Sequence, residues 1–490
     1  MARGDLLSSP HRLATFLVII CFISFLLTLF YSEIIPIPTQ IRELDFPVPR
    51  VSFERPSHFT DSELTAGDNT STPYSHSDGT YASAFKTSYV PGADDVFLMI
   101  KTGATVLWQR LPIHLSTTLP QLRHFALYSD AADVIAGIPV IDVLENVSST
   151  IKQSDQFDTY RKQQDLLAQH ANIELYESKA EIDGGWNLDK YKNLPMVAHA
   201  YRTMPSAKWY VFMDADSYIL WPNLMRWLKR INHEDKLYMG SVAYLEGEPF
   251  AHGGSGVIMS HALVSSVFGG DEPDIEHKYE EYTSWHCCGD HVLAHAFNER
   301  GTGVVSGESY PYVSWRIQGE PPVSVRYNKQ NWCNEIVTFH HLSSHDVEKL
   351  YEFENQFDVN EAIKYADVYH HFIMPYIQEG VIEEWDNLSE ARQYSKDRED
   401  DQENPQVTAY NSFDDCSKKC DEWNDCLQFR FKPGYCGLCS HVRLGTKDVN
   451  QDQTDRFKSK WKIDRIRNMR KQSGCDDIEK FSTEGSFFQT

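Results

Sequence analysis

Apolar and polar residues alternate along the middle of the chain in blocks that predict strands and helices in turn. Short apolar runs of strand length occur at 96–100 (VFLMI), 124–128 (HFALY), 173–176 and 209–213 (WYVFM). Between them lie longer stretches, near 154–170 and at 191–203, whose patterns favour helices. Strands that alternate with helices predict an α/β layer with a largely parallel sheet.

One segment near the N-terminus is apolar over a membrane-spanning length. Residues 13–31 (LATFLVIICFISFLLTLFY) carry no charge and are long enough for a transmembrane helix. Arg3, His11 and Arg12 precede it, so the positive-inside rule predicts a cytosolic tail at 1–12 and luminal placement for the chain after residue 31. A cleaved signal peptide is the alternative, but the stretch exceeds a usual signal core and no small-residue cleavage site comes promptly after it. The pattern therefore favours a single-pass type II signal anchor.

Two polar stretches divide the remaining chain. Residues 32–93 are rich in Ser, Thr, Pro and Asp without a sustained apolar period, which predicts a flexible stem. Residues 391–406 contain the acidic run SKDREDDQENP, which predicts a linker. We therefore expect a catalytic unit at 94–390, a small cysteine-rich unit at 407–475 and a tail at 476–490.

Charge limits the partners of the chain. The formal net charge of −24 opposes binding to nucleic acid or to an anionic lipid surface, because such polyanions are repelled at long range. A small anionic ligand then needs a local cation such as a metal ion. Glycosylation sequons at Asn69, Asn146 and Asn387 fit luminal exposure.

Cysteines are dense in the C-terminal unit. They stand at Cys416, Cys420, Cys426, Cys436, Cys439 and Cys475. In an oxidising lumen, disulfides are the default, and they would stabilise a domain too small to rely on its core. The CxxxC and CxxC spacings also offer four thiolates for zinc. We expect disulfides at the first five positions, because the predicted topology places these thiols in the lumen.

Two carboxylates come directly after a buried apolar strand. The run WYVFM leads into Asp214, Ala215 and Asp216, and strand alternation predicts both carboxylates on one side with Ala215 on the other. Carboxylates at the carboxyl end of a sheet strand suit Mn²⁺ or Mg²⁺ bridging a diphosphate. The alternative is that one of them caps a helix in the adjoining WPNLMRWL segment.

Three further segments carry candidate chemistry. AHGGSGVIMS, residues 251–260, is a glycine-rich turn that allows close approach of a ligand or a strand. His340 ends an apolar run and is a candidate imidazole ligand, although His341 and His345 are equally available by composition. Asp290 precedes a helical pattern, where it is either a helix cap or a general base for a hydroxyl nucleophile.

Together these segments resemble one enzyme family. YKNLP at 191–195, WYVFMDADSYI, GGSG at 253–256, CCGDHVLAHAF and VTFHHL stand in the order of the inverting glycosyltransferases that include Fringe, the β1,3-galactosyltransferases and the core 1 β1,3-galactosyltransferases. The resemblance covers residues 96 to about 357 and is strongest for the fungal branch with an appended domain. It implies a GT-A type α/β fold that binds a nucleotide-sugar.

The resemblance also implies roles for the residues at matching positions. Asp214, Asp216 and His340 would bind Mn²⁺ (or Mg²⁺), and Asp290 would be the general base. The implied donor-binding positions are Lys101, Thr102, Gly103, Tyr191, Asn193 and Asp214, and the glycine turn on the acceptor side is Gly253, Gly254 and Gly256. Two departures stand out: Ala215 replaces the middle one of three acids, and Gly289 replaces the Glu of a Glu-Asp pair, which leaves one candidate base.

The segment from about 407 to 467 resembles a PAN/apple module, a small disulfide-rich α+β domain. Its cysteines, CLQFRF and the closing WKIDRI are the matching parts. Such modules bind protein or carbohydrate. The basic run RFKSKWKIDRIRNMRK is either a solvated face or a site for an anionic ligand.

The resemblance thus implies a Golgi enzyme that transfers a hexose, with galactose expected, from a UDP-sugar to a glycan or glycoprotein in a β1,3 linkage. A retaining transferase is one alternative, because DxD motifs also serve that class. A lectin-like receptor that uses the PAN module and carries an inactive transferase domain is the other. The intact set Asp214, Asp216, Asp290 and His340 argues against an inactive domain.

Overall fold

The computed structural model of the chain describes residues 89–173, 185–270, 275–305, 316–377, 379–396, 398–399 and 408–474. The predicted anchor, most of the predicted stem, Asn69, Cys475 and the C-terminal tail lie outside these residues. Of the strand predicted at 173–176, only Ile173 is described. Within the described ranges, no helix is both long and apolar enough to cross a bilayer.

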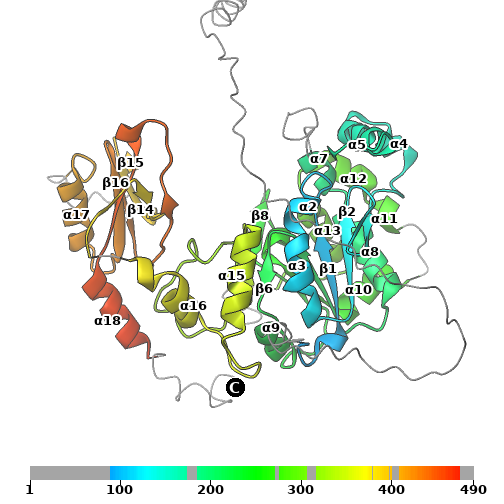
Figure 1. Cartoon of the computed structure of the whole chain (residues 1–490), viewed down its shortest axis with the longest axis horizontal. Coiled ribbons are helices and arrows are strands. Elements are labelled where there is room, and N and C mark those ends of the chain that lie inside the picture. The colour runs from blue at the N-terminus through cyan, green and yellow to red at the C-terminus, as the bar shows by residue number, and fades with distance from the viewer. Residues whose placement is uncertain are drawn as a thin grey trace, which may run out of the picture. The chain divides into compact units, whose positions relative to one another are not determined.

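A seven-stranded sheet lies at the centre of the N-terminal part, with the order β3-β4-β2-β1-β5-β10-β7. Figure 1 labels two of its neighbouring strands, β1 and β2. Its strands are β1 (Val96–Lys101), β2 (Phe125–Ser129), β3 (Asp133–Ile135), β4 (Ile138–Asp142), β5 (Trp209–Asp214), β7 (Tyr238–Met239) and β10 (Val257–Ser260). Strands β4, β2, β1 and β5 are parallel, whereas β3 is antiparallel to β4, and β10 is antiparallel to β5 and β7. The sheet is therefore mixed rather than largely parallel, because antiparallel strands complete both edges.

Both faces of this sheet are covered by helices, so its central strands β1 and β5 carry no charged residue before their last positions, Lys101 and Asp214. Along β1, Phe97 and Met99 enter one core while Leu98 and Ile100 enter the other. The first core is shared with α8 (Asn193–Thr203), α10 (His261–Phe268) and α13 (Gly289–Asn298), and the second with α2 (Leu107–Arg110), α3 (Pro112–Ser116) and α9 (Trp221–Leu228) (Figure 1). This layered α/β arrangement fits the expected GT-A-like fold.

Shorter elements surround the sheet. They are α4 (Ser149–Lys152), α5 (Asp158–Ala168), α7 (Gly185–Asp189), the hairpin β8 (Val242–Leu245) and β9 (Glu248–Ala251), α11 (Ile275–Lys278) and α12 (Glu280–Trp285). A two-stranded sheet joins β6 (Tyr218–Ile219) to β11 (Thr338–Phe339), which leads to α15 (Ser344–Glu354) and α16 (Tyr365–Phe372). Ser343 caps α15 in a reciprocal capping box with Asp346, so the chain turns within three residues after β11.

The C-terminal part forms a second sheet, with the order β12-β19-β16-β17-β14-β15. Its elements are β12 (Ile382–Glu383), β14 (Arg392–Ser395), β15 (Arg398–Glu399), β16 (Gln428–Lys432), β17 (Tyr435–Cys439), β19 (Lys458–Trp461), α17 (Phe413–Glu422) and α18 (Ile463–Ser473), with β13 (Trp385–Asp386) and β18 (Thr446–Lys447) paired beside it. The linker predicted at 391–406 is therefore wrong over its first part, where β14 pairs with β17. Tyr394 is buried in this strand, which lies between β17 and the edge strand β15, and the charged residues after Tyr394 made the segment read as a linker.

Two disulfides stabilise this C-terminal part. The structure joins Cys416 to Cys436 and Cys420 to Cys426. Cys439 is a free buried thiol whose Sγ lies 2.9 Å from His441 Nε2. The expected disulfide at Cys439 is wrong in this structure, because the other four cysteines pair among themselves. The same pairing removes the thiolates that a zinc site would need. In addition, the structure joins the adjacent Cys287 and Cys288, a pairing that the sequence did not suggest.

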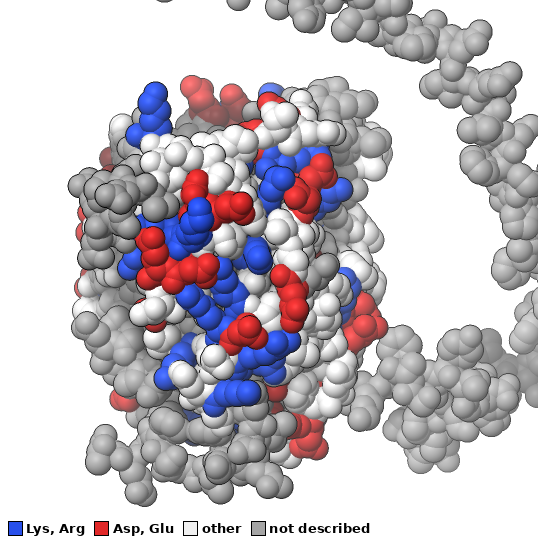
Figure 2. All heavy atoms as spheres, turned by 90° about the vertical axis from the view of Figure 1, so that its left-hand side faces the viewer, with Lys and Arg blue, Asp and Glu red and all other residues white. Residues whose placement is uncertain are grey.

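The basic run near the C-terminus is largely engaged in contacts within the chain. The Arg465 guanidinium donates to the carbonyl oxygens of Cys420, Trp423 and Cys426, where it satisfies groups at the end of α17. Lys462 lies 2.7 Å from an Asp421 carboxylate oxygen. Figure 2 looks onto the side where α17 and α18 lie and shows Lys and Arg interspersed with Asp and Glu. This surface favours the solvated-face alternative over a site for an anionic ligand.

The sequons differ in accessibility. Asn146 is exposed, whereas Asn387 is fully buried and its Nδ2 donates to the Phe429 carbonyl oxygen at 3.1 Å. The expectation that Asn387 carries a glycan is therefore wrong for the folded chain, because its amide nitrogen is enclosed and already bonded.

A buried acid joins α15 to the β6 strand. The Glu354 carboxyl group accepts hydrogen bonds from Tyr218 Oη at 2.5 Å and Gln121 Nε2 at 3.3 Å. Burial raises the pKa of Glu354 to about 7, although both hydrogen bonds oppose this shift. The folded chain therefore binds this proton more tightly than the unfolded chain does.

Peptide mapping checks the disulfide pattern. Under non-reducing conditions, mass spectrometry should find the Cys416–Cys436 and Cys420–Cys426 cross-links, since both pairs are bonded in the folded chain. Cys439 should react with an alkylating reagent only after unfolding, because it is buried. Rapid alkylation of all five cysteines in the native protein would contradict the prediction.

Substituting Glu354 should remove a pH dependence of stability. The pKa rises from an ordinary 4.5 to about 7 on folding, so the stabilisation is present below 4.5 and is lost as pH rises through 7. Urea unfolding at about pH 5 and about pH 8 should show a smaller loss of stability for Glu354→Gln than for wild type. Glu352→Gln, exposed on the same helix, should behave as wild type; equal pH responses in all three proteins would refute the assignment.

Candidate functional site

The Asp214–Asp216 segment forms a turn at the carboxyl end of β5. Asp214 is the last residue of the strand, and Ser217 N donates to its carbonyl oxygen. Asp216 lies in the turn, so the predicted strand alternation through Asp216 is wrong: β5 ends two residues earlier. Neither acid caps a helix, since the N-cap of α9 is Leu220. The two carboxylates instead face different partners.

A buried histidine supports this turn. His114 Nε2 lies 2.9 Å from the Ala215 carbonyl oxygen, and Nδ1 lies 2.9 Å from Thr118 Oγ1. Burial lowers the pKa of His114 to about 4, so the ring is neutral near pH 7. The Ala215 carbonyl can only accept, which makes Nε2 the donor and Nδ1 the acceptor. The imidazole thereby fixes the backbone between the two acids.

Lys101 places a buried positive charge among the acids. It is the last residue of β1, and the parallel register sets it beside Asp214. Its Nζ lies 2.6 Å from Asp189 Oδ2 and 3.3 Å from Asp214 Oδ1. Burial alone would lower the pKa of Lys101, but the Asp189, Asp214 and Asp290 carboxylates hold it above its ordinary value. Lys101 therefore stays charged and neutralises part of the acidic cluster.

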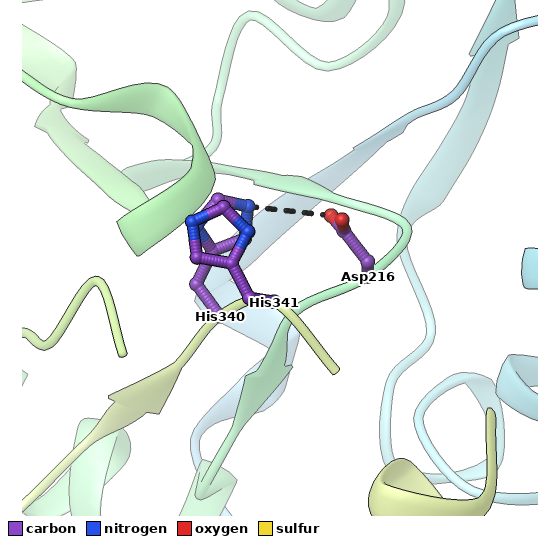
Figure 3. A group of neighbouring side chains, drawn as sticks. All are labelled: Asp216, His340 and His341. Carbon is purple, nitrogen blue, oxygen red and sulfur yellow. Dashed lines mark ion pairs between the residues drawn. The ribbon is translucent and has the colours of Figure 1, made fainter. Parts of the chain in front are cut away.

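Asp216, His340 and His341 form the group best arranged to hold a metal ion. One ligand atom from each lies within 4.8 Å of the others (Figure 3). His340 Nε2 is 3.4 Å from Asp216 Oδ1, and Arg110 Nη1 is 3.2 Å from Asp216 Oδ2. Among the described residues, Asp214 does not belong to this group. Burial alone would raise the pKa of Asp216, but His340 and Arg110 keep it below its ordinary value.

The donor atoms fit a divalent ion. Nδ1 of His340 is buried and lacks a hydrogen-bond partner within the described part of the chain, and the buried Oδ1 of Asp216 faces His340 as an ion pair without a hydrogen bond. Buried polar atoms without partners are rare and call for an explanation such as a missing ion. Carboxylate oxygens suit both Mg²⁺ and Mn²⁺, and an imidazole nitrogen in the donor set favours a transition-metal ion over Mg²⁺.

The glycine turn places two consecutive residues, Gly253 and Gly254, against Asp290 and His340. A Cβ on Gly254 would lie 2.1 Å from His340 Cε1, and one on Gly253 would lie 2.5 Å from Asp290 Oδ1. Only glycine permits both approaches. Gly256 has φ of +88° and lets the chain enter β10. The turn therefore fixes the spacing between two reactive groups.

Asp290 is held as a carboxylate acceptor. Its Oδ1 accepts from Asn193 Nδ2 at 2.8 Å and its Oδ2 from the Gly253 amide at 2.7 Å. The residue lies in the first turn of α13 without capping it, because Cys288 is the N-cap and no side-chain cap bond forms. Asp290 is half-buried. Two donors thus orient its carboxylate.

The predicted donor-binding positions separate into two sets. Thr102 directly follows β1, and Asn193 donates to Asp290. Thr102 Oγ1 and Asn193 Oδ1 are buried atoms without hydrogen-bond partners among the described residues. Gly103 lies against Asp130 and Lys192. Tyr191 lies elsewhere: its ring packs on Phe157 and its hydroxyl donates to Gln156. The Tyr191 side chain supports the fold and does not face the site.

Sequence reasoning missed several residues of the site. Asp189 bridges Lys101 and Lys192, His114 holds the Ala215 carbonyl, and Arg110 faces Asp216. None of them belongs to a recognisable motif. Their roles depend on partners far away in the sequence, so only a signal for spatial proximity would have identified them.

One known family matches a segment of the chain that contains part of this site. Residues 92–296 match the family model described as Fringe-like. The matched segment holds β1, the Asp214–Asp216 turn, the glycine turn and Asp290, and it ends before His340. A search of curated proteins found no match. The match supports the predicted relationship to Fringe and the β1,3-glycosyltransferases, and it points to a glycosyltransferase that acts on glycans.

Two glycine substitutions should affect different halves of the site. Gly254→Ala would push on the His340 ring and should weaken Mn²⁺ binding, whereas Gly253→Ala would push on Asp290 and should weaken it less. Each should destabilise the fold by about 1–3 kcal/mol, the usual effect of overpacking. Calorimetric titration with Mn²⁺ and urea unfolding measure both effects. Gly380→Ala, with open space around its Cβ position, is the control; wild-type Mn²⁺ affinity in Gly254→Ala would show that His340 is not a ligand.

Proposed function

We propose that this chain is an inverting, metal-dependent glycosyltransferase that moves a hexose, galactose by resemblance, from a UDP-sugar to a hydroxyl of a glycan or glycoprotein. A β1,3 linkage and a Golgi type II location with a luminal catalytic domain complete the proposal. The observation that carries it is the glycine turn, where Gly253 contacts Asp290 and Gly254 contacts His340. The proposed base and the proposed metal ligand therefore contact two consecutive glycines at the carboxyl end of the parallel strands.

The base half of the site acts on the acceptor. An acceptor hydroxyl is a poor nucleophile until its proton leaves, and Asp290 offers a carboxylate oriented by Asn193 and Gly253. The hydroxyl oxygen forms a bond to the anomeric carbon as the bond from that carbon to the diphosphate oxygen breaks. The proton passes to Asp290. Attack opposite to the leaving group inverts the configuration.

The other half of the site stabilises the leaving diphosphate. A Mn²⁺ (or Mg²⁺) ion held by Asp216 and His340 would neutralise charge that develops on the diphosphate. Arg110, whose side chain is 40% exposed beside Asp216, adds a cation at the same edge. Lys101 lies beside Asp214 and offsets part of the negative charge that Asp214 and Asp290 bring to the site. Asp214 thus fits a role in donor binding, held by Lys101, better than a place in the metal group.

The C-terminal part is proposed to be a PAN/apple-like accessory module that binds carbohydrate or protein. Its two disulfides and its sheet with α17 fit the expected small α+β domain. The resemblance alone suggests its ligand.

The metal set and the base should be separable by mutation in the full-length chain. Asp216→Ala and His340→Ala remove ligands, so Mn²⁺-dependent UDP binding and turnover should fall together. Asp290→Asn cannot accept the proton and should reduce transfer by roughly 10²-fold or more while UDP and Mn²⁺ affinities stay near wild type. Calorimetry with UDP and Mn²⁺, and UDP release from a panel of UDP-sugars, measure the two effects.

The control for Asp290→Asn is Glu299→Gln, an exposed acid at the other end of α13. It should keep wild-type turnover. If Asp290→Asn lost UDP affinity as severely as Asp216→Ala, Asp290 would be a donor-site residue and the mechanism would be wrong. The anomeric configuration of the product, read by NMR, distinguishes the inverting from the retaining reaction. Absence of UDP release from every UDP-sugar would favour a receptor with an inactive domain.

A further inference from the structure

His341 occupies an unusual backbone position next to the metal group. Its φ is +58°, in the left-handed region that residues other than glycine seldom adopt. Such strain costs on the order of 1 kcal/mol and persists where the surroundings impose it. The conformation places the His341 ring against the His340 ring, with 3.8 Å between centroids, and brings a ligand nitrogen into the Asp216 group (Figure 3).

The chain on both sides of His341 is fixed. Before it, Phe339 pairs with Tyr218 in the β6–β11 ladder. After it, the Leu342 amide donates to the Asp216 carbonyl oxygen at 2.9 Å, and Ser343 caps α15. The turn is therefore tied to the backbone of the residue that supplies the carboxylate. The His341 side chain is exposed, so its nitrogens remain accessible to an ion.

We propose that His341 is a further metal ligand and that it selects the ion, favouring Mn²⁺ over Mg²⁺. The inference rests on the proposed metal-dependent function and refines its choice of ion. One carboxylate and two imidazoles form a donor set that is richer in nitrogen than Mg²⁺ prefers. Mg²⁺ gains little from imidazole and keeps its water, whereas Mn²⁺ accepts both donor types.

The test compares two substitutions at one position in the full-length chain. His341→Ala removes the imidazole but keeps a Cβ in the left-handed region. His341→Gly removes the imidazole and relieves the backbone strain, so its stability should equal or exceed that of wild type. Both should weaken Mn²⁺ binding about 10-fold or more, at least the effect of losing an outer-shell partner. Mg²⁺ affinity should change little, so the preference for Mn²⁺ over Mg²⁺ should shrink.

A spectroscopic readout reports the ligand directly. Pulsed electron paramagnetic resonance of bound Mn²⁺ should detect two coordinated histidine nitrogens in wild type and one in His341→Gly. His345→Ala is the matched control, because His345 is an exposed histidine four residues away that lies outside the metal group. It should keep wild-type affinity and both nitrogen couplings.

The outcomes separate the inference from the proposed function. Wild-type Mn²⁺ affinity and two nitrogen couplings in His341→Gly, with binding lost in Asp216→Ala, would overturn the role of His341 alone. No Mn²⁺ binding to wild-type protein would overturn both. Selective loss of Mn²⁺ affinity and of one nitrogen coupling in His341→Gly, with His345→Ala unchanged, would support the inference.

Discussion

The geometry of the site depends on one buried ammonium group. Lys101 is 4% exposed and lies among the carboxylates of Asp189, Asp214 and Asp290. Uncompensated acids in such a place would take up protons or move apart, because charged groups are costly to bury and like charges repel. The Lys101 ammonium offsets part of this negative charge, although burial still raises the pKa of Asp214 to about 6. The position of Lys101 is set by the parallel pairing of β1 with β5, so the register of the sheet determines the electrostatics of the site.

The sequence predicted the strands and the motifs better than it predicted their contacts. The apolar runs that became β1, β2 and β5 were evident because helices cover both faces of the sheet. Asp290 and the glycine turn were identified from local pattern and resemblance. The group of Asp216, His340 and His341 was harder to predict from the sequence. The FHH motif offers two adjacent histidines, and only the backbone angle at His341 shows where the second ring points. The strand β14 and the buried Asn387 were missed because charge and sequon patterns say nothing about tertiary pairing.

Gly253 and Gly254 show how a local feature of the sequence controls a contact between distant residues. A missing Cβ is a local property of the sequence, yet at Gly253 and Gly254 it determines how closely two distant side chains approach the same turn. Asp290 comes from the start of α13 and His340 from the end of β11, and each uses the space beside one glycine. The spacing between Asp290 and His340 at this turn thus depends on the distance between two consecutive backbone residues, which varies less than the position of a side chain does.

The pairing of β6 with β11 has a consequence for the biosynthesis of the chain. Tyr218 of β6 pairs with Phe339 of β11 and also bonds to Glu354, 136 residues further along the chain, whereas the Fringe-like segment ends at residue 296. A nascent polypeptide that has emerged only to that point carries the sheet, Asp216 and Asp290, but it lacks both histidines. Long-range closure of this kind is slow compared with local folding. The group formed by Asp216, His340 and His341 is therefore assembled late, and a chain that has not yet reached His340 holds only Asp216 of it.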